Sequence, residues 1–88
     1  MTPSIDISLK LFAALRESTG VAEEALSVPS GSTVGSVRAT LMLRGGAWHK
    51  GLSDAKRCRA AVNHQMADEA RALEPTDELA FFPPVTGG

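Results

Sequence analysis

The six residues from Pro83 to Gly88 end in a carboxylate, and this carboxylate is the group in the sequence with the clearest chemical use. Proline lacks a backbone N–H and has a fixed φ, so Pro83-Pro84 should end strand pairing and begin a stiff, extended segment. From Pro83 the segment can reach roughly 20 Å. Gly87 and Gly88 have no Cβ, and a narrow channel could therefore enclose the backbone on all sides. A frayed terminus is the alternative interpretation.

A carboxylate held on such a stalk could enter the nucleotide site of another protein and be adenylated. The acyl adenylate could then accept sulfur, which gives a thiocarboxylate, or an amine, which gives a conjugate. We therefore expect the chain to act as a reagent through Gly88, while catalysis belongs to its partners.

The remaining reactive side chains do not form a site of their own. His49 and His64 have no second ligand at metal spacing, so a zinc site is not expected. Cys58 lies between Arg57 and Arg59, which could lower the pKa of its thiol. It lacks the His or acid partner of a catalytic nucleophile, and a semi-buried strand residue is the favoured interpretation. The sequence contains neither a Walker A motif nor a G-x-G-x-x-G fingerprint.

Length and composition predict one small domain over residues 1–82, followed by the tail over 83–88. The net charge is −1 and no basic stripe is present, which argues against nucleic acid as a partner. No apolar run approaches the ~20 residues that cross a membrane, and the first residues do not resemble a signal peptide. With one cysteine there can be no internal disulfide. These features are typical of a cytoplasmic protein.

Period-2 alternation over Ile5–Leu11 predicts the clearest strand, and it places Phe12 on the outward, polar side. Residues 13–18 favour a short helix that Gly20 ends. Residues 22–28 read as a second strand, which a turn over 29–32 closes.

The second half of the chain alternates one main helix with short strands. Thr33 should cap a helix that begins at Val34 and that Gly45-Gly46 ends. Trp48 and Leu52 would anchor a short irregular helix within residues 47–56. The remaining predictions are a strand over 59–62, a turn over 63–65, a short return strand at 66–67, a core plug at Leu73 and a last strand over 78–82. This order favours an α+β fold of the β-grasp type, a mixed sheet packed on one main helix, with the first and last strands adjacent.

Residues 77–88, DELAFFPPVTGG, closely resemble the C-terminus of the small-subunit family of molybdopterin synthase, the MoaD family. Residues 9–17 with Gly20 resemble its first strand and helix, and residues 33–38 and 60–63 resemble its main helix and third strand. The likeness covers most of the chain. Two stretches depart from the family: the turn over 74–77 lacks the usual glycine, and residues 45–57 match only through Trp48.

The resemblance implies a ubiquitin-like sulfur carrier in molybdenum cofactor biosynthesis. An ATP-using adenylating enzyme would activate Gly88, and a sulfur-relay protein would convert it to a thiocarboxylate. Residues Pro83, Pro84, Val85, Thr86 and Gly87 would then lie in a channel of the synthase large subunit. There the carrier would donate sulfur to cyclic pyranopterin monophosphate and form the molybdopterin dithiolene, within a heterotetramer. The chain itself would bind no cofactor and no metal, and ATP would be used by the activating partner.

Alternation places Phe12 and Phe82 on outward faces of neighbouring strands, with Met66 near the preceding turn. Large exposed apolar side chains on a small protein often mark a partner site. The resemblance implies that these residues contact the large subunit and the activating enzyme, with Arg16 as a polar contact at the rim. The alternative is that Phe12 and Phe82 are covered by the short helix and a loop.

Two other functions remain open at this point. A ubiquitin-like modifier would also be adenylated at Gly88, but it would be joined to lysines of target proteins. A sulfur carrier for thiamine or cysteine synthesis would differ only in the acceptor of the sulfur.

Overall fold

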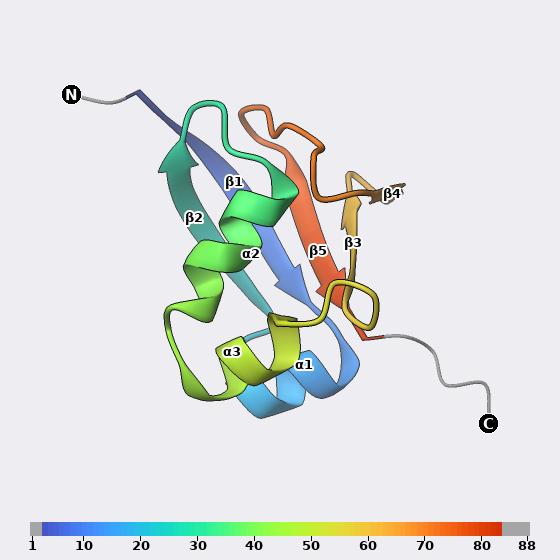
Figure 1. Cartoon of the computed structure of the whole chain (residues 1–88). Helices are drawn as coiled ribbons and strands as arrows, with labels where there is room; N and C mark the ends of the chain where they lie inside the picture. The colour runs from blue at the N-terminus through green and yellow to red at the C-terminus, as the bar shows by residue number, and fades with distance from the viewer. Residues whose placement is uncertain (1–2, 84–88) are drawn as a thin grey trace.

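The computed structural model describes residues 3–83 (Figure 1), so the predictions for Pro84, Val85, Thr86, Gly87 and Gly88 lie outside the described residues. In chain order, the elements are β1 (Ser4–Leu11), α1 (Ala13–Thr19), β2 (Glu23–Pro29), α2 (Val34–Met42), α3 (Gly46–Leu52), β3 (Arg59–Val62), β4 (Gln65–Ala67) and β5 (Glu78–Phe82). No helix within residues 3–83 is long and apolar enough to cross a membrane.

The strands form one sheet in the order β2-β1-β5-β3-β4. β1 and β5 are parallel neighbours, while the other pairs are antiparallel. In Figure 1, α2 crosses in front of the sheet, and α1 and α3 lie at the end where β5 leaves it. This mixed sheet with one main helix is the β-grasp arrangement, and the predicted pairing of the first and last strands is confirmed.

Alternation along the two central strands decides which side chains enter the core. Leu9 and Leu11 in β1, and Leu79 and Phe81 in β5, are all 2% exposed or less, and they point toward α2. Fully burying a side chain of this size contributes roughly 1.5–3 kcal/mol. These four side chains therefore anchor the centre of the sheet in the core.

The beginning of α2 agrees with the sequence. The Thr33 hydroxyl accepts a hydrogen bond from Ser36 N (3.1 Å), and the Ser36 hydroxyl accepts one from Thr33 N (2.8 Å). This reciprocal pair satisfies two backbone donors at the helix start. Val34, Val37 and Leu41 form the predicted buried stripe.

The predicted end of this helix is wrong. α2 stops at Met42, because the N–H groups of Leu43 and Arg44 turn back to carbonyls three residues earlier. Gly45 and Gly46 instead begin α3, with φ of 76° and 53°. Such positive φ values favour glycine, so the pair redirects the chain between two helices.

Other boundaries differ by one or two residues. β2 runs from Glu23 to Pro29, so Pro29 belongs to the strand and not to the turn. Asn63 and His64 alone form the tight turn, both at positive φ, and Gln65 already pairs with Val62. The short helix anchored by Trp48 and Leu52 is confirmed as α3.

Candidate functional site

β5 is an interior strand of the sheet, and it ends at the residue before Pro83. Leu11 of β1 pairs with Phe81 on one side, and Arg59 of β3 pairs with Phe82 on the other. Phe12 N donates a hydrogen bond to Phe81 O (3.3 Å) at the end of the ladder. Pro83 follows directly and is half-buried. The root of the tail is thus held by two neighbouring strands.

The face of the sheet turned away from α2 carries an apolar patch, which we call the open-face patch. Ala80 pairs with Ala61, and Ala61 pairs with Met66, so these three side chains lie in one row across β5, β3 and β4. The two alanines are 8% exposed and lie outside the main core cluster. Phe82 follows on the same face of β5.

The register of β1 and β5 also places Phe12 beside Phe82. Its φ of −124° and ψ of 156° continue the extended geometry of β1, and Leu11 is level with Phe81. Phe12 is 45% exposed and Met66 is 56% exposed, while Phe82 is half-buried. Phe12 is therefore not covered by the short helix, contrary to the alternative interpretation. The open-face patch comprises Phe12, Ala61, Met66, Ala80 and Phe82; its role as an interface stays a prediction.

Charged side chains border this patch. Lys10 Nζ lies 3.1 Å from Glu78 Oε1, and His64 Nε2 lies 3.4 Å from Glu78 Oε2. Hydrogen bonding to Glu78 raises the pKa of Lys10. Arg16 is exposed in α1, as expected for a rim residue.

A pocket of about 530 Å³ lies on the helical side of the tail root. Pro83 forms one wall, and α1 and α3 form the others. The lining residues are Ala14, Leu15, Ser18, Ala47, Lys50, Gly51 and Pro83. The two helices approach closely at Gly51, where an added Cβ would come within 2.5 Å of Leu15 Cδ2. The sequence analysis missed this pocket, and the only signal was a glycine inside the short helix.

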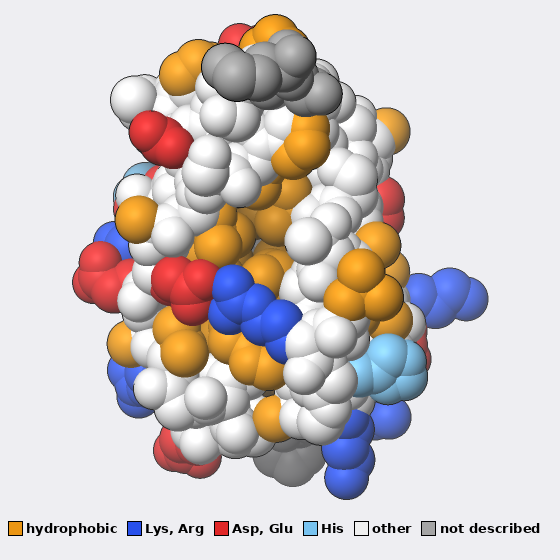
Figure 2. All heavy atoms as spheres, turned by 90° about the vertical axis from the view of Figure 1, so that its left-hand side faces the viewer, with side chains coloured by type: hydrophobic (Ala, Val, Ile, Leu, Met, Phe, Trp, Pro, Cys, Tyr) orange, Lys and Arg blue, Asp and Glu red, His pale blue; other side chains and the backbone are white. Residues whose placement is uncertain are grey.

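On the side of the molecule that carries β2, some hydrophobic side chains remain partly exposed. Figure 2 shows hydrophobic side chains in a hollow there, with a basic side chain lying against an acidic one across it. Leu26 of β2 and Met42 of α2 are only partly buried against the core. The Arg44–Glu24 ion pair, 2.5 Å between Nη2 and Oε2, joins the segment after α2 to β2, and Arg44 also stacks on Trp48.

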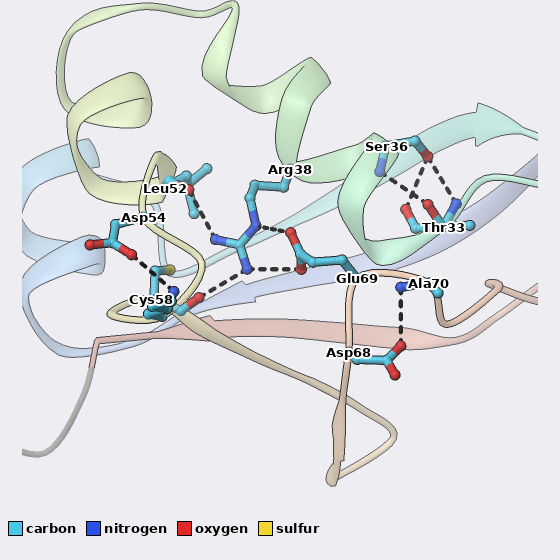
Figure 3. Close-up of polar contacts among 10 residues, drawn as sticks. Thr33, Ser36, Arg38, Leu52, Asp54, Cys58, Asp68, Glu69 and Ala70 are labelled. Carbon is cyan, nitrogen blue, oxygen red and sulfur yellow. Dashed lines mark hydrogen bonds and ion pairs between the residues drawn. The ribbon is translucent and has the colours of Figure 1, made fainter.

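Arg38 is a buried cation that the sequence analysis assigned no role (Figure 3). Its Nε and Nη2 donate to the Glu69 carboxylate at 2.6 and 3.1 Å. Nη1 donates to Leu52 O, and Nη2 also donates to Cys58 O, both at 2.9 Å. The one signal was an arginine inside the buried stripe of α2. Arg38 therefore ties α2 to α3, to the segment before β3 and to the segment after β4.

Cys58 is 2% exposed and is not a reactive thiol. Burial raises its pKa, and this effect outweighs the opposing influence of the Arg38 guanidinium. The suggestion that Arg57 and Arg59 activate it is wrong, because the side chain is directed into the core. The favoured interpretation of a semi-buried strand residue is right only in making Cys58 structural, because the residue is fully buried and lies in the bend just before β3.

Within residues 3–83 no three His, Cys, Asp or Glu side chains are grouped so that they could hold a metal ion. The His64 side chain is 84% exposed, in agreement with its predicted place in a polar turn.

This fold and site define a class of protein: ubiquitin-like β-grasp domains in which an interior strand leads into the C-terminal segment. Residues 9–88 match the model of the ThiS family, and the chain belongs to that family.

Named relatives and a solved structure agree with this assignment. The chain is 38% identical to the molybdopterin synthase sulfur carrier subunit of Escherichia coli, over 93% of this chain and 99% of the relative. It is 35% identical to the Arabidopsis thaliana protein of the same name, over 99% of this chain and 88% of the relative. The structure of SAMP1, small archaeal modifier protein 1, from Haloferax volcanii superposes with a TM-score of 0.81 at 30% identity, covering 94% of this chain and 99% of that one.

Proposed function

We propose that this chain is the sulfur carrier subunit of a molybdopterin synthase. The observation that carries the proposal is the position of β5, which lies between β1 and β3 and is followed directly by Pro83. A rigid interior strand is a suitable base for an extended arm that must enter a partner. Family membership and the names of the relatives support the choice of pathway.

The chemistry would take place at Gly88, in the active sites of partner proteins. In an ATP-using adenylating enzyme, a carboxylate oxygen of Gly88 attacks the α-phosphate of ATP and pyrophosphate leaves. The terminal sulfur of a persulfide on a sulfur-relay protein would then attack the acyl adenylate and displace AMP, and a thiol would reduce the resulting acyl disulfide, which releases the Gly88 thiocarboxylate. In the synthase large subunit, this sulfur is transferred to cyclic pyranopterin monophosphate, and water returns Gly88 to a carboxylate. Two carriers are used for each dithiolene.

The described residues would act by docking. The open-face patch, with Phe12, Met66 and Phe82 as its large members, would bury against the large subunit, and Arg16 would contribute at the rim. Residues Pro83 to Gly87 would lie in the channel that leads to the active site. We expect the process to take place in the cytoplasm, in a heterotetramer of two carriers and a large-subunit dimer.

A single-turnover reaction tests this proposal. The chain, prepared as its Gly88 thiocarboxylate, is mixed with a large subunit and cyclic pyranopterin monophosphate. Dithiolene formation is followed together with the intact mass of the carrier. Product should appear as the carrier returns to the carboxylate mass. A thiocarboxylate that survives beside a demonstrably active large subunit would exclude this pathway.

A second candidate is a protein modifier, which the likeness to the archaeal modifier protein favours. In that case Gly88 would form isopeptide bonds with lysines of target proteins. Incubation with the adenylating enzyme, ATP and a cell extract distinguishes the two. Conjugates of higher mass that disappear when Gly88 is deleted would favour the modifier. Their absence, together with sulfur transfer, would favour the carrier; sulfur transfer to a thiamine or cysteine precursor would indicate another pathway.

A further inference from the structure

The positive charges of this protein are divided into two groups. Of its nine Lys and Arg residues, four form ion pairs in the structure: Lys10, Arg38, Arg44 and Arg71. The other five make no ion pair with any residue in the described range 3–83: Arg16, Lys50, Lys56, Arg57 and Arg59. All five are exposed. We call them the tail-root cations.

These cations surround the point where the chain leaves the sheet. Arg59 pairs directly with Phe82 across β3 and β5. Lys50 lines the same pocket as Pro83, and Arg16 belongs to α1, which forms another wall of that pocket. Lys56 and Arg57 lie in the segment that leads into β3. In Figure 1 this segment, α1 and α3 are all at the end of the molecule from which β5 exits.

Few acidic groups offset this charge locally. The same elements contribute two carboxylates, Glu17 in α1 and Asp54 after α3, and Asp54 Oδ1 accepts a hydrogen bond from Lys56 N. Asp68 and Glu69 line a pocket together with Arg59, but Glu69 is already paired with Arg38. Because the whole chain carries a net charge of −1, the rest of the molecule is net acidic. The charge is therefore unevenly distributed, with the positive end of the molecule at the end of β5. These exposed cations do little for the stability of the fold.

We propose that the tail-root cations dock on an acidic surface around the channel entrance of the protein that receives the tail. This inference rests on the proposed insertion of the tail into a partner. Charges placed around the root would attract such a surface before the tail enters, which raises the association rate constant and aligns the arm with the opening. The apolar pocket beside Lys50 would accept an apolar side chain of the partner next to one of its acidic groups.

The test compares two double variants with equal changes in net charge. Lys50→Gln/Arg57→Gln removes two tail-root cations. Ser4→Glu/Ser30→Glu adds two negative charges at exposed positions at the opposite end, where β1 begins and β2 ends. Association with a molybdopterin synthase large subunit is followed by stopped flow at about 20 mM and about 500 mM salt. The first variant should lower the association rate constant about tenfold at low salt, and the second by less than about twofold. Equal effects of the two variants would overturn the inference.

A titration without the large subunit separates this inference from the proposed function. An oligoglutamate peptide is added to the full-length protein, and backbone amide shifts are recorded. Shifts centred on Lys50 and Arg57 that vanish in the Lys50→Gln/Arg57→Gln variant support the cation cluster, even if no complex with a large subunit forms and the proposed function fails. Shifts centred elsewhere overturn it, as does tighter binding of a single-stranded DNA of equal charge.

Discussion

The guanidinium of Arg38 lies 4.9 Å from the centroid of the Phe81 ring, one residue before Phe82 and two before Pro83. A cation over an aromatic face is attracted to it, and more strongly when both are buried. The same guanidinium bonds Glu69, Leu52 O and Cys58 O. One buried side chain thus links the helical layer to the strand that supports the tail.

Replacing Arg38 with methionine should destabilise the fold strongly. The change leaves the Glu69 carboxylate and two buried carbonyl oxygens without their donor. Glu69 is 43% exposed and can regain water, so most of the loss should come from the two carbonyl oxygens, at about 1–3 kcal/mol for each. Urea unfolding of Arg38→Met should show this loss, whereas the partly exposed Arg44→Met should lose about 1 kcal/mol or less. Equal losses in the two variants would contradict a special role for Arg38.

Replacing Thr76 with glycine should stabilise the protein. Thr76 has φ of 69°, and it lies in a turn that the Asp77 N–H to Glu74 O bond closes (3.1 Å). A left-handed conformation costs a residue with a Cβ roughly 1–2 kcal/mol. Glycine relieves this strain, but part of the gain is offset because glycine loses more conformational entropy on folding. The net gain should be about 0.5–1 kcal/mol, measured as a higher urea midpoint at constant slope.

Asn63 provides the control for Thr76. Asn63 also has positive φ (51°), but its side chain bonds the Asp77 carboxylate and Glu78 N at 2.8 and 2.9 Å. Asn63→Gly should therefore destabilise the protein although it relieves the same backbone strain. A gain in stability at Asn63, or a loss at Thr76, would contradict this account of the two turns.

Replacing Met66 with aspartate should weaken binding of the large subunit while leaving stability nearly unchanged. Met66 is 56% exposed at the edge of the open-face patch, and a charge there would be desolvated in a complex. We expect affinity to fall at least about tenfold, which corresponds to about 1.4 kcal/mol. Leu43→Asp is the matched control, since Leu43 is 85% exposed after α2 and outside the patch. Calorimetric titration of both variants is the measurement, and similar losses would argue against the patch.

The carboxyl of Asp77 should make stability depend on acidic pH. Burial acts to raise its pKa, but hydrogen bonds from Glu74 N and Asn63 and the nearby Arg71 guanidinium together hold that pKa below its usual value. Because the folded-state pKa is lowered, the contribution is present above the unfolded-state pKa and is lost as pH falls through the folded-state pKa. Thermal unfolding between neutral pH and about pH 3 should show a smaller decline for Asp77→Asn than for the wild type. An unchanged profile would contradict this.

The sequence was sufficient to place the main strands and their buried faces, because alternation is a strong local signal, but the pattern alone does not fix the order of the strands in the sheet. Leu9, Leu11, Leu79 and Phe81 are all buried as predicted, and Phe12 faces outward as predicted. The end of α2 was placed wrongly, since Gly45 is equally suited to stop one helix or start the next. The burial of Cys58 and the structural role of Arg38 depend on contacts between residues far apart in sequence, such as that of Arg38 with Glu69. No local pattern reveals such contacts. The pocket beside Pro83 depends on how two short helices meet at Gly51.

The parallel pairing of β1 with β5 also has a consequence for biosynthesis. β5 is the last strand within residues 3–83 but lies in the interior of the sheet, so the sheet cannot form completely until residues 78–82 have been made. A fragment that stops earlier leaves β1 and β3 with unpaired edges, and such edges promote aggregation and degradation. Every molecule that presents residue 83 to a partner has therefore already been able to complete its fold. The order of strands thus links the availability of residue 83 to completion of the sheet.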